Sequence, residues 1–447
     1  MSAGRVYDAV VIGSGFGGGI AACRLAEAGK RVCVLERGRR FAAGDFPDDP
    51  ARAPELVWHE TANPAGMFDV RLLRDVTVIT AAGVGGGSLV YASVQLRAPA
   101  EVFEQGWPAA ITRAELDPWY TLTEDALQPR PTPPEPILDK VRAFTAAGRL
   151  AGKAAEPLPI AVHFGDEREH PFSGVRQQGC QNLARCDIGC PVLAKNTVDI
   201  TYIARAESHG ADVRPLHLAT AIEPPSWAGG PWRVAYRTVG DTRTGSVEAR
   251  VVVLAAGAIG TPRLLLKNKR RLPALSDALG TRFSGNGDAL ALALDARADD
   301  VRGARNDVGP VMTSRLDYTA ARRLMLADGG LPPGFHGLLD VARGVDVIRG
   351  RRRWLLRLVQ GLVRVGVSDQ PLRPRHVGSL DRRDNRDAVI FLLIGRDAAD
   401  GRMHLTWPFK RFDIRWTMEA SRPLFDDLRR TAEEVANGAQ ARLFYAL

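Results

Sequence analysis

The sequence predicts an α/β fold, in which a parallel β-α-β unit opens the chain and a mixed α+β region accompanies it. Residues 7–12 (YDAVVI) form a compact apolar run, which is typical of a strand buried on both faces. A glycine-rich turn at 13–18 leads into helical spacing of apolar residues over 20–28. Residues 31–35 (RVCVL) make a second buried strand, which ends at the acidic residue Glu36. Strand, turn, helix, strand and terminal acid in this order predict a Rossmann-like unit.

Each residue of the turn has a physical role in such a unit. Gly13 permits the tight turn, Gly15 lets the backbone approach a pyrophosphate, and Gly18 lets the helix pack closely on the strand. The amino terminus of the helix offers free N–H groups to phosphates, and Glu36 can accept hydrogen bonds from ribose hydroxyls. Gly29 is placed to end the helix. The unit predicts an adenine dinucleotide, although by itself it does not separate FAD from NAD.

The composition excludes several classes of protein. The 447 residues are 45% hydrophobic and 25% charged, which is ordinary for a soluble globular chain. No run reaches the ~18 apolar residues of a membrane-spanning helix. Five cysteines are too few for a disulfide framework, and residues 1–6 lack the apolar core of a secretory signal, so we expect a cytoplasmic protein that can still touch a membrane peripherally. The net charge of +9 fits either attraction to anionic surfaces or a genome whose base composition favours arginine codons.

A second glycine-rich segment follows at residues 80–94. Its small residues are Gly83, Gly85, Gly86, Gly87 and Ser88. A backbone with so few side chains can lie flush against a flat ring, which a plain turn would not require. We therefore expect this segment to contact a planar group.

The middle of the chain predicts further elements of the same body. Residues 194–202 are predicted to enter a helix, and residues 211–222 are predicted as a single strand. Apolar and polar residues alternate over 232–239 and again over 246–253, which predicts a small antiparallel meander.

A buried strand ending at Leu254 leads through small residues into another helix. We predict Thr261 as its N-cap and Pro262 as its first residue, because a hydroxyl caps a helix well and proline suits the first turn. The segments at 80–94 and 251–266 resemble, in this order, the two signatures of the glucose–methanol–choline (GMC) oxidoreductase family. The first of them is especially similar to the cholesterol oxidase branch.

The resemblance covers most of residues 5–290, whereas 291–447 match only loosely, as a variable substrate domain would. The chain departs from the family pattern at two places. Tyr91–Ala92 stand where well-known members of the branch have Asn-Gly, so flavin tuning is in doubt. Asn268–Lys269 replace a closing Ser-Gly.

The resemblance implies FAD as the cofactor and two discontinuous domains. The FAD-binding domain would comprise 1–120 and 180–290, and a mixed α+β substrate domain would comprise 121–179 and 291–447, incomplete at its carboxyl end. The residues expected to bind FAD are Gly13, Gly15, Phe16, Gly17, Gly18, Glu36, Gly83, Gly85, Gly86, Gly87, Ser88, Tyr91, Ala92, Val94, Ala219, Ala256 and Gly257.

The resemblance also implies a reaction: FAD-dependent oxidation of the 3β-hydroxyl of a sterol to a ketone, with electrons passing to oxygen or another acceptor. A dehydrogenase for a non-steroid alcohol and a non-catalytic flavin-binding remnant are the alternatives. The family's carboxyl-terminal block, which carries a catalytic histidine and an asparagine, has no counterpart in the sequence up to Leu447. No catalytic residue is therefore assigned, and we expect the chain to be weakly active or inactive.

Two weaker patterns admit more than one interpretation. Cys180, Cys186 and Cys190 are spaced much like a ferredoxin run, but three thiols leave a four-ligand cluster incomplete, so we expect a buried structural role and no metal. Arginines interleave with Leu, Val and Trp over 349–365, which suits a lid over the substrate cavity better than a basic helix on an anionic membrane. No segment has the aromatic–basic layout of an RNA-binding sheet, so no nucleic-acid partner is expected.

Overall fold

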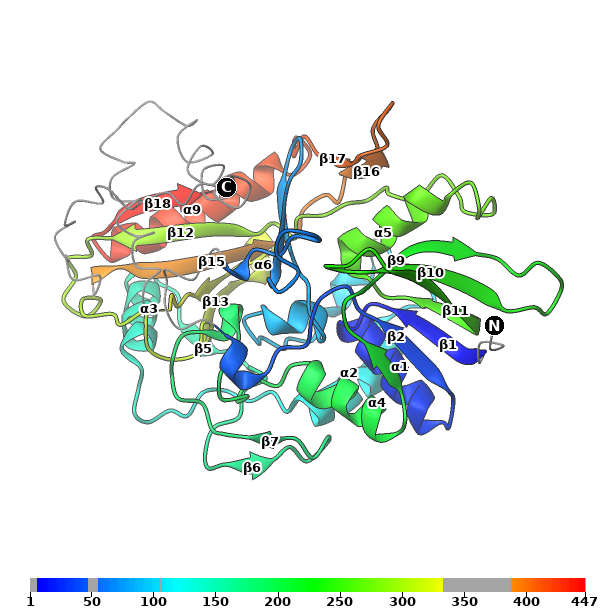
Figure 1. Ribbon diagram of the computed structural model, residues 1–447. Helices are drawn as coiled ribbons and strands as arrows, with labels where there is room; N and C mark the ends of the chain where they lie inside the picture. The colour runs from blue at the N-terminus through cyan, green and yellow to red at the C-terminus, as the bar shows by residue number, and fades with distance from the viewer. Residues whose placement is uncertain (1–5, 47–54, 105, 333–386, 447) are drawn as a thin grey trace, which may run out of the picture.

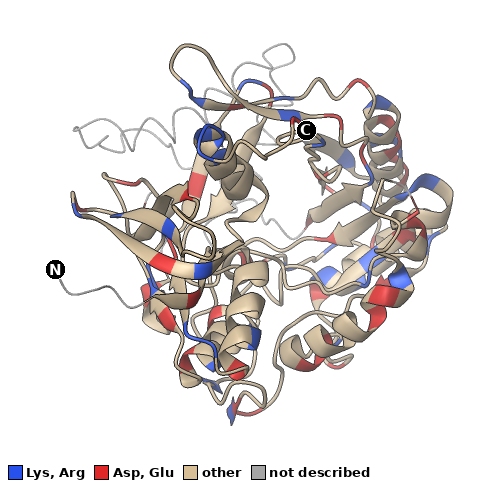
Figure 2. Cartoon of the chain, turned by 90° about the vertical axis from the view of Figure 1, so that its right-hand side faces the viewer, with Lys and Arg blue, Asp and Glu red and all other residues tan. Residues whose placement is uncertain are grey.

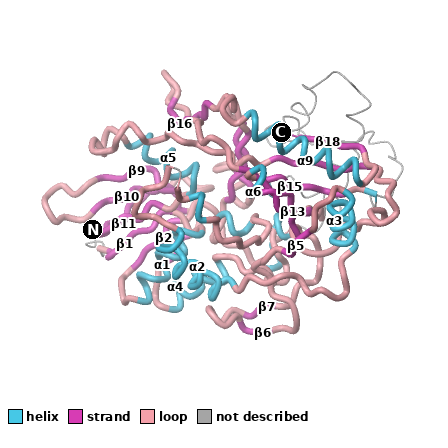
Figure 3. Tube along the Cα trace, turned by 180° about the vertical axis from the view of Figure 1, so that it is seen from behind, coloured by secondary structure: helices cyan, strands magenta, loops and turns pink. Residues whose placement is uncertain are grey.

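A computed structural model describes residues 6–46, 55–104, 106–332 and 387–446. Two six-stranded sheets lie at opposite ends of the molecule, and loop-rich segments connect them (Figure 1, Figure 3). The predicted segment 349–365 lies outside the described residues. The described helices are all too short or too polar to cross a membrane. Lys and Arg are interspersed with Asp and Glu along the chain (Figure 2).

The first sheet contains the predicted β-α-β unit. Its strands are β1 (Tyr7–Ile12), β2 (Val32–Leu35), β8 (Asp212–Arg214), β9 (His217–Glu223), β10 (Trp232–Thr238) and β11 (Thr244–Leu254), in the order β8-β2-β1-β11-β10-β9. Strands β8, β2, β1 and the second half of β11 are parallel. Helix α1 (Phe16–Glu27) connects β1 to β2, and Gly29 follows its end with a φ of +72°. These elements confirm the predicted start of the fold.

Strand β11 serves two neighbours. Its residues from Thr244 to Ala249 pair antiparallel with β10, and those from Ala249 to Leu254 pair parallel with β1. The two strands predicted over 246–254 are therefore one continuous strand, which joins the meander to the parallel part of the sheet.

The prediction of a single strand over 211–222 is wrong, because this stretch forms two strands. The chain forms β8 beside β2 at one edge of the sheet and β9 at the opposite edge. Pro215 separates the two strands, and it has no N–H with which to continue a ladder. Leu216 follows in a left-handed conformation (φ +59°), and the His217 amide then bonds to the Glu36 carbonyl (2.7 Å).

The predicted start of the helix after β11 is also wrong. Helix α5 (Gly257–Asn268) begins at Gly257, whose φ of +80° turns the chain directly from strand into helix. Thr261 therefore lies inside the helix, and its Oγ1 accepts the Ala256 amide at 3.0 Å.

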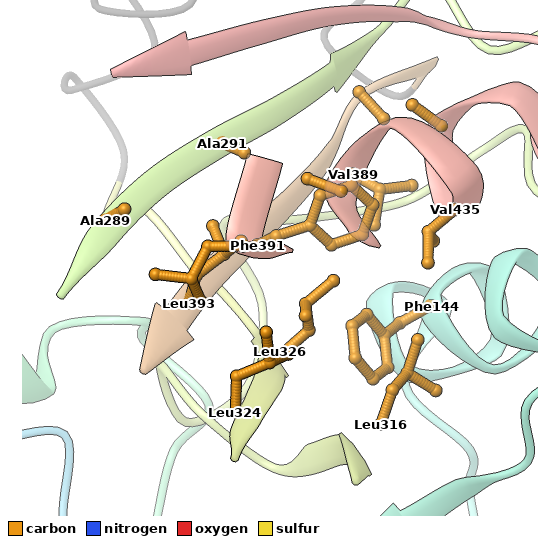
Figure 4. Close-up of a cluster of buried hydrophobic side chains, with 14 of the residues drawn as sticks. Phe144, Ala289, Ala291, Leu316, Leu324, Leu326, Val389, Phe391, Leu393 and Val435 are labelled. Atoms are coloured by element: carbon orange, nitrogen blue, oxygen red, sulfur yellow. The ribbon is translucent and has the colours of Figure 1, made fainter. Parts of the chain in front are cut away.

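The second sheet is antiparallel throughout. Its strands are β5 (Ala155–Pro157), β12 (Ala289–Leu294), β13 (Ser314–Tyr318), β14 (Leu324–Asp328), β15 (Val389–Gly395) and β18 (Arg442–Ala446), in the order β18-β12-β15-β14-β13-β5. Helices α3 (Asp139–Leu150) and α9 (Arg422–Gly438) pack against it. Figure 4 shows Phe144 of α3, Phe391 of β15 and Val435 of α9 converging in the core between them.

Shorter elements complete the described structure. Three hairpins are β3 (Phe68–Leu72) with β4 (Thr77–Ala81), β6 (Arg168–Glu169) with β7 (Arg176–Gln177), and β16 (Arg402–Leu405) with β17 (Phe412–Arg415). The other helices are α2 (Arg113–Leu127), α4 (Ala204–Ser208) and α6 (Thr319–Arg322), and a π-helix at Asp199–Ile203 runs into α4. Short 3-10 turns lie at Ala43–Asp45, Gly86–Leu89, Ala100–Val102 and Cys186–Ile188.

Candidate functional site

The turn after β1 needs two of its glycines for the protein's own packing. Gly13 has a φ of +98°, and a Cβ there would lie 2.4 Å from the Ala255 carbonyl oxygen. A Cβ on Gly18 would lie 1.9 Å from the Gly13 carbonyl oxygen. Both contacts are far below van der Waals distance, so glycine is required for the tight turn and for the close approach of α1 to β1.

Three other glycines of the site have free space beside them. A Cβ on Gly15 would meet its nearest atom, the Gly86 Cα, at 3.7 Å, and a Cβ on Gly87 would meet nothing within 4 Å. Gly17 also has room, with its nearest contact at 4.0 Å. The packing of the described residues therefore does not require glycine at these positions. A bound group in this space would require it.

The amino terminus of α1 is uncapped. Gly15 is its N-cap and supplies no side chain, and the first turn contains no acidic residue. The first backbone bond of the helix runs from the Gly19 amide to the Gly15 carbonyl (2.7 Å). The amides of 16–18 precede that bond, so they remain available as donors at the positive end of the helix dipole, an arrangement that can hold phosphates.

Glu36 ties the turn to the end of β2. The side chain is buried, and Oε2 accepts hydrogen bonds from the Ser14 amide (3.1 Å) and the Ser14 hydroxyl (2.7 Å). Oε1 accepts the Gly38 amide at 2.8 Å. The carboxylate thus stands at the carboxyl end of β2, where an acidic residue is expected to meet a ribose.

Ser14 is a site residue that the sequence reasoning missed. Its hydroxyl donates to Glu36 and accepts the Gly85 amide at 3.1 Å, so one buried oxygen joins the turn, the acid and the second glycine segment. The only signal in the sequence is a small hydroxyl residue between Gly13 and Gly15, and this does not identify its partners.

Three glycines of the second segment are explained by contacts within the protein. A Cβ on Gly83 would lie 2.6 Å from Leu89 Cδ1, and Gly85 has a φ of +107°. Gly86 has a φ of +54°, and its Cβ would lie 2.6 Å from the Gly15 Cα. The two glycine-rich segments therefore touch backbone to backbone. The abundance of glycine in this segment does not need a flat ring for its explanation, except at Gly87.

A buried lysine, also missed by sequence reasoning, supports the carboxyl-terminal half of the second segment. Lys195 is 1% exposed, and its Nζ donates to the carbonyls of Leu89 (3.0 Å), Tyr91 (3.0 Å) and Cys186 (2.5 Å). Burial lowers the pKa of Lys195. Ser88 acts in the same way on a smaller scale, because its buried hydroxyl donates to Gly85 (2.7 Å) and accepts the Val198 amide (2.8 Å).

Aromatic side chains connect α1 with the second segment. The rings of Phe16 and Tyr91 meet edge to face at 5.4 Å between centroids. The Tyr91 hydroxyl donates to the Asn196 carbonyl at 2.9 Å, and the Lys195 Nζ lies 4.9 Å from the ring centre. Tyr91 is therefore held from both its edge and its face.

The remaining predicted site residues are distributed around this centre. Ala256 lies against the first turn, since a Cβ on Gly13 would be 2.9 Å from its Cα, and Gly257 follows it. Val94 pairs with Ile160, and the half-buried Ala92 precedes it. Ala219 lies on β9, which follows β11 and β10 in the sheet order from β1.

Buried acids lie beside the second segment. Asp199 approaches Gly85, where a Cβ would be 3.1 Å from its Oδ1, and this oxygen has no hydrogen-bond partner among the described residues. Burial raises the pKa of Asp199 and raises the pKa of Asp187 to about 6.

Cys180 and Cys186 lie next to this region with neutral thiols. Burial raises the pKa of Cys186 to about 11 and the pKa of Cys180 to about 12, so neither is a thiolate near neutral pH. Cys180 and Cys190 pack on the apolar cluster around Ile160. Across the described ranges, no three His, Cys, Asp or Glu side chains are grouped as a metal ion would need.

Two described histidines are held by hydrogen bonds to other parts of the protein. His163 Nδ1 lies 2.9 Å from an Arg130 nitrogen, and its Nε2 lies 2.7 Å from the Asp166 carbonyl. His170 Nδ1 accepts the Phe172 amide at 3.2 Å, and burial lowers the pKa of His170 to about 4. No catalytic base is assigned among the described residues.

Comparison with known proteins finds cholesterol oxidases among the relatives. The cholesterol oxidase of Mycobacterium tuberculosis is 34% identical over an alignment of 378 positions, which covers 77% of this chain and 64% of that protein. The cholesterol oxidase of Acinetobacter baumannii is 32% identical over an alignment of 315 positions, which covers 64% of this chain and 55% of that protein. The chain therefore spans less than two thirds of the length of these relatives.

The fold is also similar to that of solved structures. The crystal structure of pyridoxine 4-oxidase from Mesorbium loti superposes with a TM-score of 0.56 at 14% identity, over 98% of this chain and 81% of that one. The sequence profile described as GMC oxidoreductase matches residues 16–269, which are more than half of the chain. With this match and its relatives, the chain belongs to the GMC oxidoreductase family.

Proposed function

We propose that the two glycine-rich segments bind FAD. The space beside Gly15 and Gly87 carries the proposal, because the packing of the described residues leaves room for a side chain there and the chain has none. The pyrophosphate would lie at the uncapped amino terminus of α1, whose amides are free to donate. Glu36 would accept the ribose hydroxyls and would repel a 2′-phosphate, which favours FAD over a phosphorylated dinucleotide.

The isoalloxazine would lie along the exposed backbone of Gly87, next to Tyr91. Lys195, Ser88 and the Asn196 carbonyl hold this stretch in place by hydrogen bonds, so the surface that faces the ring is preorganised. The contacts predicted for Ala92, Val94 and Ala219 belong to the same proposal.

We further propose that the chain oxidises the hydroxyl of a sterol, with oxygen or another acceptor receiving the electrons. FAD supplies the two-electron acceptor for the hydride that leaves the carbinol carbon. The similarity to two cholesterol oxidases supports the sterol as substrate. The hydroxyl proton must pass to a base or to an ordered water as the hydride leaves.

The test is the visible absorbance spectrum of the purified 447-residue chain, before and after anaerobic addition of cholesterol. We expect a bound flavin whose absorbance bleaches only slowly with cholesterol, since no catalytic base is assigned among the described residues, and does not bleach with short-chain alcohols. Bleaching by non-steroid alcohols alone would refute the sterol assignment. A bound flavin that no alcohol reduces would leave a flavin-binding chain without this reaction, and absence of flavin would refute the FAD site.

A further inference from the structure

The tip of the β16–β17 hairpin carries the two most exposed large apolar side chains in the described part of the chain. Trp407 is 90% exposed and Phe409 is 77% exposed. Pro408 lies between them, and Lys410 and Arg411 follow, all on the surface. Single exposed apolar residues are common, but two neighbouring aromatic rings at one protruding tip form an apolar patch, which is typical of a contact site.

The base of this hairpin is fixed to the body of the protein. Met403 and Ile414 face each other across the two strands and are buried in the core. The Met403 amide donates to the Gly280 carbonyl at 2.7 Å. At the other end, the Thr406 amide donates to the Arg411 carbonyl at 2.8 Å and closes the loop. The hairpin is therefore a fixed support that projects its tip away from both sheets (Figure 1).

The base of the hairpin carries charges of both signs, because Arg402 and Arg415 face each other there, next to Asp413. Asp400 and Asp413 lie near its base, where their carboxylates accept N–H groups of the body at 2.9 and 3.0 Å. At the tip, Lys410 and Arg411 are exposed, and no carboxylate of the described residues lies at ion-pair distance from either. The tip thus combines an apolar pair with unpaired positive charge.

We propose that this tip binds the surface of an anionic lipid membrane. Tryptophan prefers the boundary between headgroups and acyl chains, and Phe409 would enter beside it. Lys410 and Arg411 would bind the lipid phosphates, because basic side chains near an anionic leaflet are attracted to it. Two aromatic side chains bury only ~150–250 Å² each, whereas a stable protein interface needs about 800 Å² on each partner, so a protein partner fits this tip less well. The proposal does not depend on FAD binding.

The test is co-sedimentation of the full chain with sucrose-loaded vesicles of phosphatidylcholine, with and without phosphatidylglycerol. We expect binding to the anionic vesicles that weakens as salt is added, since the electrostatic part is screened. The double variant Trp407→Ser, Phe409→Ser should bind at least about 10-fold more weakly than the unaltered chain, a loss that corresponds to ~1.4 kcal/mol. Trp227→Ser is the matched control, because Trp227 is 65% exposed in a different loop and should leave binding unchanged.

Circular dichroism and Tm measurements check that the variants are folded. The substituted side chains are exposed, so we expect neither the spectrum nor the Tm to change. Equal binding of the double variant and the unaltered chain to anionic vesicles would overturn the proposal, because a different segment would then bind the membrane. Failure of the unaltered chain to bind anionic vesicles would overturn it as well. Dimers of the unaltered chain that become monomers in the double variant, without vesicle binding, would assign the tip to a protein interface instead.

Discussion

Replacing Lys195 by methionine tests whether the buried ammonium holds the second glycine-rich segment in place. The substitution keeps the length of the side chain and removes three hydrogen bonds to carbonyl oxygens. A buried carbonyl left without a donor costs about 1–3 kcal/mol. The bond to Leu89 is buried and the other two are partly buried, so the gross loss is about 5 kcal/mol.

Part of this loss is recovered, because methionine does not carry the desolvation cost of a buried ammonium. We therefore expect the free energy of unfolding of Lys195→Met to fall by about 3 kcal/mol. With an unfolding entropy of ~2.1 cal/mol/K per residue, this corresponds to a decrease in Tm of roughly 3 °C if the whole chain unfolds together. Urea titration followed by tryptophan fluorescence measures the change.

The matched control is Lys30→Met, because Lys30 is exposed and its loss should change stability by no more than about 0.5 kcal/mol. We also expect Lys195→Met to retain less FAD after gel filtration, since Tyr91 and Leu89 lose their common anchor. If Lys195→Met and Lys30→Met unfold at the same urea concentration as the unaltered chain, the three bonds contribute no net stability and the reasoning is refuted.

Three further substitutions test the site and the fold. Gly87→Ala should leave the urea midpoint of the FAD-free chain unchanged, because the added Cβ meets nothing within 4 Å. The same substitution should weaken FAD binding, measured by equilibrium dialysis, about 10-fold or more. Unchanged FAD binding would contradict the placement of the ring. Gly18→Ala should lower the free energy of unfolding by about 3 kcal/mol, because the added Cβ would lie 1.9 Å from the Gly13 carbonyl oxygen. Gly44→Ala is the control and should leave stability unchanged, because Gly44 has open space beside it. Thermal melts of both variants test this difference. The pKa of His170 is about 4 in the folded chain and 6.5 in the unfolded chain, so His170 binds its proton more weakly when the chain is folded. The resulting contribution of His170 to the free energy of unfolding is therefore complete above pH 6.5 and is lost as pH falls toward 4. His170→Gln should remove up to about 3 kcal/mol of this acid sensitivity, and urea midpoints that fall equally with pH in both chains would argue against it.

Local sequence patterns were enough to predict the helices and strands whose apolar residues follow a regular spacing. The sequence determined β1, α1, β2 and the meander of β10 and β11, because apolar spacing and a terminating glycine act over a few neighbouring residues. The same reasoning was wrong where one residue redirected the chain. Pro215 and Leu216 send it from one edge of the sheet to the other, and Gly257 starts α5 before Thr261.

By itself the sequence therefore determined the family, the opening unit and the glycines of the first turn. The tertiary structure alone decided how these parts support one another. The Ser14 hydroxyl meets the Gly85 amide, and Gly86 meets Gly15, across some 70 residues of chain. Lys195 reaches Leu89 over a still longer separation. Such contacts depend on how sheet, helix and loop pack in three dimensions, and no periodicity along the chain encodes which distant partner a buried serine or lysine will find.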